Sequence, residues 1–120
     1  MSVGAWDVLE AHLAELIFDQ GLPVRKAIPT ACQTYPETSV HYLVLSLSSA
    51  ASAIEDGWPL EDRMNQRNLL DLYRAAAAVS SDLAMHDILG QRCDTCGQLL
   101  DYWRTTPDQF FDARAVHSTS

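Results

Sequence analysis

Two cysteines in the C-terminal third of the chain have the spacing of a metal-ligand pair. Cys93 and Cys96 are separated by two residues and followed by Gly97, an arrangement in which a tight turn aims both sulfurs at one tetrahedral zinc ion. Such a site needs two further ligands, and the chain holds no second Cys-x-x-Cys motif. The remaining candidates lie at no diagnostic spacing: Cys32, His12, His41, His86 and His117.

The Cys93–Cys96 pair has three interpretations. It can be structural, with two small and partly buried residues near a helix start, or it can hold zinc. In a redox pair, a helix N-terminus would lower the pKa of Cys93, but the neighbouring Asp94 opposes thiolate formation and no βαβ pattern surrounds the motif. We expect the structural role, with zinc as the alternative.

Other residue types that perform chemistry occur without a recognisable constellation. Asp82 and His86 are four residues apart and would share a helix face as metal ligands, although a hydrogen-bonded structural pair is the simpler interpretation. The chain contains no Gly-x-Ser-x-Gly motif, and its five glycines are isolated, so neither a nucleophile elbow nor a phosphate loop is expected. We therefore expect no catalytic residues, and an enzyme with a site between helices is only a second alternative.

Aromatic residues gather toward the C-terminus. Exposed together and rimmed by aspartates, they would form a patch for a partner with basic and apolar features; otherwise they close the end of the core. The candidate partner-binding residues are Trp58, Tyr102, Trp103, Phe110 and Phe111.

The charge of the chain limits its partners. Eight basic residues against 16 acidic ones, in 120 residues, give a net charge of −8 and argue against binding nucleic acid or anionic lipid. Residues 1–21 and 82–112 each carry −4, whereas the middle of the chain is nearly neutral. The two acidic regions are therefore places where a protein partner can bind.

Targeting signals are not evident in the sequence. The longest uncharged segment, residues 38–54, is shorter than the roughly 20 apolar residues that span a bilayer, and no basic flank and apolar core mark a signal peptide. We expect a cytoplasmic protein with reduced cysteines. A single Lys beside seven Arg, with much Ala, indicates a GC-rich bacterial gene.

Helical periodicity dominates the N-terminal half. Apolar residues predict a helix from Ala5 to Gln20, stopped by Gly21. Residues 22–37 contain three prolines and predict one or two short helices, with Pro29 at a first helical position. Residues 40–48 fit a strand or a helix. Spacing over four turns, and a Thr34-x-x-Glu37 capping-box pattern upstream, favour the helix.

The longest predicted helix runs from Leu60 to Leu89, between the Asp56–Pro59 turn and Gly90. Its wide apolar arc, extended by Leu70, Ala77, Ala84 and Ile88, predicts a central helix touched by several others. Ser80-Ser81-Asp82 could divide it into two helices.

These features predict an all-α fold, a single-domain bundle of about five helices with a long central helix over residues 1–115, followed by a frayed tail at 116–120. The leading functional hypothesis is a protein–protein interaction module, such as an adaptor, a regulator or a chaperone-like accessory protein. Self-association through the Ser- and Ala-rich helix is a further expectation. The alternatives are a protein that holds zinc through Cys93 and Cys96 and an enzyme with a site between helices.

Overall fold

The computed structural model describes residues 5–57, 63–106 and 110–113 of the chain. Within them the fold is all-α, as predicted, and it contains five α-helices and one π-helical segment. The elements are α1 (Ala5–Ala14), η1 (Glu15–Asp19), α2 (Val24–Thr34), α3 (Val40–Gly57), α4 (Arg63–Ile88) and α5 (Cys96–Thr105).

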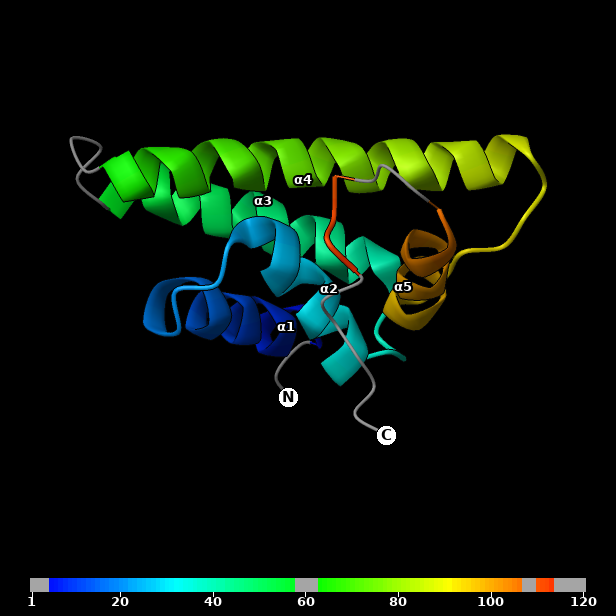
Figure 1. Ribbon diagram of the computed structural model, residues 1–120, viewed down its shortest axis with the longest axis horizontal. Coiled ribbons are helices and arrows are strands. Elements are labelled where there is room, and N and C mark those ends of the chain that lie inside the picture. Colours follow the sequence, from blue (N-terminus) through cyan, green and yellow to red (C-terminus); the bar gives the residue numbers. More distant parts are fainter. Residues whose placement is uncertain (1–4, 58–62, 107–109, 114–120) are drawn as a thin grey trace.

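The helices pack in layers around one core. Helix α4 runs the length of the molecule and is antiparallel to α3, while α1 packs on the other side of α3 (Figure 1). Helix α2 contacts α1, α4 and α5, so it joins the two ends of the chain. None of the helices in the described ranges is long and apolar enough to cross a lipid bilayer.

The first predicted helix is present, but Glu15–Asp19 near its end form a π-helix. Gln20 N–H donates to the carbonyl oxygen of Glu15 at 3.0 Å, which is the wider hydrogen bond of this conformation. The segment ends at Gly21, whose φ of 72° is the left-handed cap that the sequence predicts. Leu22 N–H then bonds back to the Leu16 carbonyl at 2.9 Å.

Helix α2 corrects the prediction for Pro29. Pro29 lies inside this helix rather than at its first position, and Pro23 is the residue that precedes the first turn. A proline inside a helix leaves the carbonyl four residues earlier without its donor. Here that carbonyl belongs to Arg25, and it accepts a hydrogen bond from Asp112 N–H at 3.0 Å.

The ambiguous segment at residues 40–48 is helical, and the proposed cap at Thr34 is wrong. Thr34 is the last residue of α2, where its hydroxyl bonds to the Thr30 carbonyl at 3.1 Å. The first N–H of α3 is satisfied across the fold, because Val40 N–H donates to the Asp94 carbonyl at 3.0 Å. This long-range bond, together with a local one from His41 N–H to the Ser39 hydroxyl at 3.2 Å, replaces the predicted cap at Thr34.

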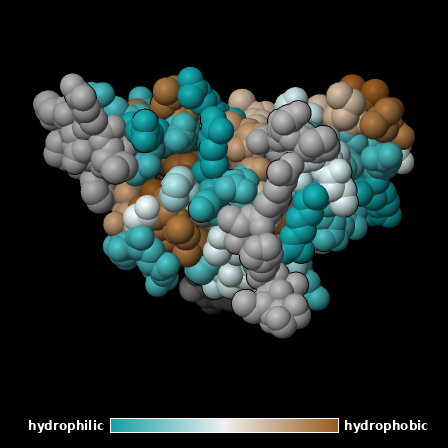
Figure 2. Space-filling view, viewed as in Figure 1, coloured by the Kyte–Doolittle hydropathy of each residue, from teal (hydrophilic) through white to brown (hydrophobic). Residues whose placement is uncertain are grey.

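Helix α4 is continuous from Arg63 to Ile88, so residues 80–82 do not divide it. The predicted turn around Trp58 and the predicted helix start at Leu60 lie outside the described residues. At the other end Gly90 has a φ of 72°, and Gln91 N–H bonds to the His86 carbonyl at 2.8 Å, as expected for a helix stop. Apolar surface is exposed at this end of the molecule (Figure 2).

Candidate functional site

The apolar side of helix α4 is only partly covered by other helices. Its inner side is buried against the core by Leu72, Ala75 and Val79. The four residues expected to widen the buried arc instead face solvent, with exposed fractions of 50% for Leu70 and 78% for Ile88. We call this surface the α4 outer face, formed by Leu70, Ala77, Ala84 and Ile88.

The outer face continues at the C-terminal end of α4. Met85 is 50% exposed and Leu89 is 60% exposed, and they lie three residues before and one residue after Ile88. Together the three residues make the apolar surface seen at this end of the molecule (Figure 2). Exposed large side chains that cluster in this way are a common mark of a contact surface.

The end of α4 is also acidic. Asp87 is exposed, and its carboxylate has no hydrogen bond or ion pair within the described ranges. Asp94 in the following loop is exposed and pairs with Arg92 at 3.0 Å. Asp101 on α5 is exposed as well. The unpaired charges in the segment that contains this apolar surface are therefore mostly carboxylates.

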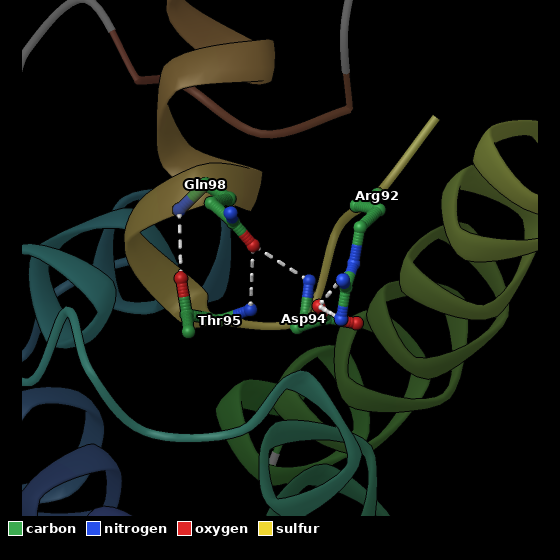
Figure 3. Close-up of polar contacts among 4 residues, drawn as sticks. All are labelled: Arg92, Asp94, Thr95 and Gln98. Carbon is green, nitrogen blue, oxygen red and sulfur yellow. Dashed lines mark hydrogen bonds and ion pairs between the residues drawn. The ribbon is translucent and has the colours of Figure 1, made fainter. Parts of the chain in front are cut away.

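The loop that contains the cysteine pair is held by a capping box at the start of α5 (Figure 3). Gln98 N–H donates to the Thr95 hydroxyl at 3.3 Å, and the Gln98 side-chain oxygen accepts from the N–H groups of Thr95 and Asp94 at 3.1 and 2.7 Å. The neighbouring Arg92–Asp94 pair braces the same loop. This network fixes where the Cys93 and Cys96 backbones lie.

The two cysteines of the motif face different surroundings. Cys96 is buried, and its sulfur accepts a hydrogen bond from the buried thiol of Cys32 on α2. This bond raises the pKa of Cys32 well above its usual value and lowers that of Cys96. Cys93 is half-buried, and burial, with a further contribution from the charge of Asp94, raises its pKa to about 11. Thiols that stay protonated near neutral pH are poor nucleophiles.

A complete metal centre is not formed by the described residues. They contain no group of three or more His, Cys, Asp or Glu side chains arranged to hold an ion, and His117 lies outside them. Zinc binding by Cys93 and Cys96 therefore stays a prediction, which elemental analysis of protein purified without chelator tests.

The Asp82–His86 pair has a structural role. The Asp82 carboxylate accepts a hydrogen bond from the Trp103 indole at 2.9 Å, and the His86 ring nitrogen Nδ1 lies 2.7 Å from the Asp82 carbonyl oxygen. His86 is buried and packs edge-on against Tyr102, with ring centroids 4.6 Å apart. Both side chains thus join α4 to α5, in agreement with the structural interpretation of this pair.

The aromatic residues predicted to bind a partner are largely internal. Trp103 and Phe111 are 2% and 3% exposed, and their rings stack at 4.0 Å. Phe110 packs edge-on against Phe111, while Tyr102 is half-buried. Trp58 lies outside the described residues. Of the predicted partner-binding residues, the four that the structure describes close the core and do not form an exposed patch.

The α4 outer face is the surface that sequence patterns alone do not reveal. The periodicity of its residues places them on one side of the helix, but the same periodicity is typical of a buried arc. No family model, curated protein or solved structure significantly matches the chain, so its function is inferred from its own geometry.

Proposed function

We propose that the protein is an interaction module, an adaptor or regulator that binds a partner protein through the α4 outer face. One observation carries this proposal: large apolar side chains remain exposed along the solvent side of a 26-residue helix, including Ile88 at 78% and Leu70 at 50%. An apolar stripe on a regular helix matches the way in which amphipathic helices and grooves bind one another. The stripe offers such a partner a rigid surface.

The charge at the Ile88 end of the stripe favours a partner of a particular kind. Asp87 is exposed at the end of α4, Asp94 is exposed and paired with Arg92 in the following loop, and the chain carries −8 overall. A partner with apolar side chains flanked by Lys or Arg would be attracted to this surface. A second copy of the chain would bring the same carboxylates together, and like charges disfavour that arrangement. We therefore infer a different, basic protein as the partner.

The cellular setting is part of the proposal. Cys32, Cys93 and Cys96 are all free thiols, which is typical of proteins in a reducing compartment such as the cytoplasm. A cytoplasmic adaptor is consistent with this chemistry.

Two double variants test the proposal. Leu70→Glu with Ile88→Glu places charge in the outer face, whereas Ala11→Glu with Ser48→Glu makes the same change at exposed positions of α1 and α3. Both pairs avoid the core, and circular dichroism checks that the helical fold persists. We expect the first variant to lose partner binding at least about tenfold and the second to retain it.

The same experiment can contradict the proposal. If both double variants bind the partner equally well, the α4 outer face is not the contact surface. Light scattering supplies the second measurement: a wild-type dimer that the Leu70→Glu, Ile88→Glu variant dissociates would show that the face binds another copy, despite the like charges around it.

A further inference from the structure

A cavity lies on another side of α4. It has a volume of about 710 Å³ and opens between η1, the turn after it and the N-terminal half of α4. Small-molecule sites are typically roughly 300–1,000 Å³. Ile17 and Phe18, from the π-helical segment, form part of its wall together with Leu22. Such π segments are frequent at functional sites, and this one gives the cavity an apolar side.

Arginine side chains make another part of the cavity wall basic. Arg25, Arg67 and Arg74 all line the cavity, and they account for three of the eight basic residues in the chain. Arg25 lies over the Phe110 ring, 4.5 Å from its centroid, which restricts its guanidinium group. The guanidinium group of Arg67 has no hydrogen bond or ion pair to any described residue. Its donors are therefore available to a ligand.

Two carboxylates share the cavity with these arginines. Asp71 lies 4.0 Å from Arg74 and offsets part of its charge, and Asp19 is exposed at the end of η1. Three guanidinium groups against two carboxylates still leave the lining positive, in a chain whose net charge is −8. This local reversal of charge favours an anion over a cation.

Asn68 adds a polar group to the cavity wall. It lines the cavity and is only 7% exposed, yet its side-chain amide makes no hydrogen bond to the described part of the chain. Among the described residues, the fully buried side-chain atoms without a partner belong to Glu10 and His12, so the Asn68 amide still reaches the space of the cavity. A polar group of a bound molecule would satisfy this amide from within the cavity.

We propose that this cavity binds a small organic anion with an apolar body, whose carboxylate or phosphate group is held by Arg67 and Asn68. The planar guanidinium group binds either oxyanion through two parallel hydrogen bonds. The side chains of Ile17, Phe18 and Leu22 would cover the apolar part of the ligand. The cavity lining includes none of the four outer-face residues, although Arg67 and Arg74 lie one helical turn from Leu70.

Nuclear magnetic resonance titration of the full chain tests the proposal with three probes: octanoate, phenyl phosphate and inorganic phosphate. Octanoate or phenyl phosphate should shift the amide signals of Gly21, Arg67 and Asn68 in a saturable manner, with a Kd below about 1 mM. The tighter of the two identifies the carboxylate or the phosphate as the preferred group. Inorganic phosphate, which lacks an apolar body, should bind at least about tenfold more weakly.

Matched variants locate the site. Arg67→Gln should weaken the tighter probe about tenfold, and Arg92→Gln should leave it unchanged, because Arg92 is an exposed arginine of the α4–α5 loop. Asn68→Ala is the second cavity variant and should also weaken binding. The proposal is overturned if neither organic probe saturates, if inorganic phosphate binds equally well, or if the Arg67 and Arg92 variants behave alike.

Discussion

Asp112 N–H donates a hydrogen bond to the carbonyl oxygen of Arg25 at 3.0 Å, and this is the carbonyl that Pro29 leaves without its helical donor. The carbonyl group that Pro29 leaves unpaired in α2 thus binds the segment 110–113. Beside this bond, Phe111 stacks on Trp103 at 4.0 Å. The contact fixes the C-terminal segment against both α2 and α5.

Phe111→Ala should therefore destabilise the protein strongly. Phe111 is 3% exposed, and removing a buried ring costs about 3 kcal/mol of unfolding free energy. Urea denaturation measures this loss, and hydrogen exchange of the Asp112 amide should accelerate because the segment loses its anchor. Phe110→Ala is the control, with a smaller loss, since Phe110 is only half-buried. Equal stability of the Phe111 variant and the wild type would refute the packing of this segment.

Gly97 is required by a close approach between α5 and the loop after α2. A Cβ at this position would lie 3.0 Å from both the Cβ and the carbonyl oxygen of Pro36, to which Gly97 N–H donates at 2.8 Å. Gly97→Ala should lower the unfolding free energy by about 1–3 kcal/mol. At an unhindered helix position the same change stabilises by about 0.5–1 kcal/mol.

Thermal and urea unfolding show whether Gly97→Ala lowers or raises the unfolding free energy. Asp101→Ala, an exposed position of the same helix, should change stability by no more than about 0.5 kcal/mol. A Gly97 variant more stable than the wild type would mean that Pro36 does not approach α5 so closely.

Cys93 should react slowly at neutral pH. Its pKa is raised to about 11, chiefly by burial and then by Asp94, so only a small fraction is thiolate at pH 8. The rate of iodoacetamide alkylation at Cys93, followed by mass spectrometry, should keep rising above pH 9 toward the raised pKa. Asp94→Asn should move the profile to lower pH, and a rate that levels off below pH 9 would rule out this environment for the thiol.

The linked effect on stability has a defined sign. Because the folded-state pKa of Cys93 lies above the usual value of 9.0, the protonated thiol favours the folded state at lower pH. This contribution should be lost as the pH rises from about 9 toward 11.

Much of the fold follows from local patterns. Local patterns predict the helix within residues 5–20, the helical assignment of residues 40–48 and the helix stops at Gly21 and Gly90. Each of these features depends on neighbouring residues. The interior position of Pro29 is not predictable in this way, because the donor that satisfies Arg25 is Asp112, far along the chain.

The capping box shows the limit of such patterns in another way. Thr34-x-x-Glu37 and Thr95-x-x-Gln98 have equivalent sequences, but only the second caps a helix. At the first, α2 continues through Thr34, since its residues are buried against the core. A local motif does not reveal which of the two segments already belongs to another helix.

The α4 outer face could not be predicted from the sequence for a similar reason. Periodicity places Leu70, Ala77, Ala84 and Ile88 on one side of α4, but it does not show whether another helix covers them. The structure leaves that side exposed. Sequence patterns therefore assign this stripe to the core, whereas they leave open whether the C-terminal aromatic residues are exposed or buried.

Photo-crosslinking at Ser81 tests the central claim most directly. Ser81 lies on α4 between Ala77 and Ala84 and is exposed, so a photoreactive residue there stands within the proposed contact surface. We predict a covalent adduct with a single basic partner protein, absent when the same residue replaces Ser48 on α3. Crosslinking at Ser48 but not at Ser81, or equally at both positions, would contradict the account.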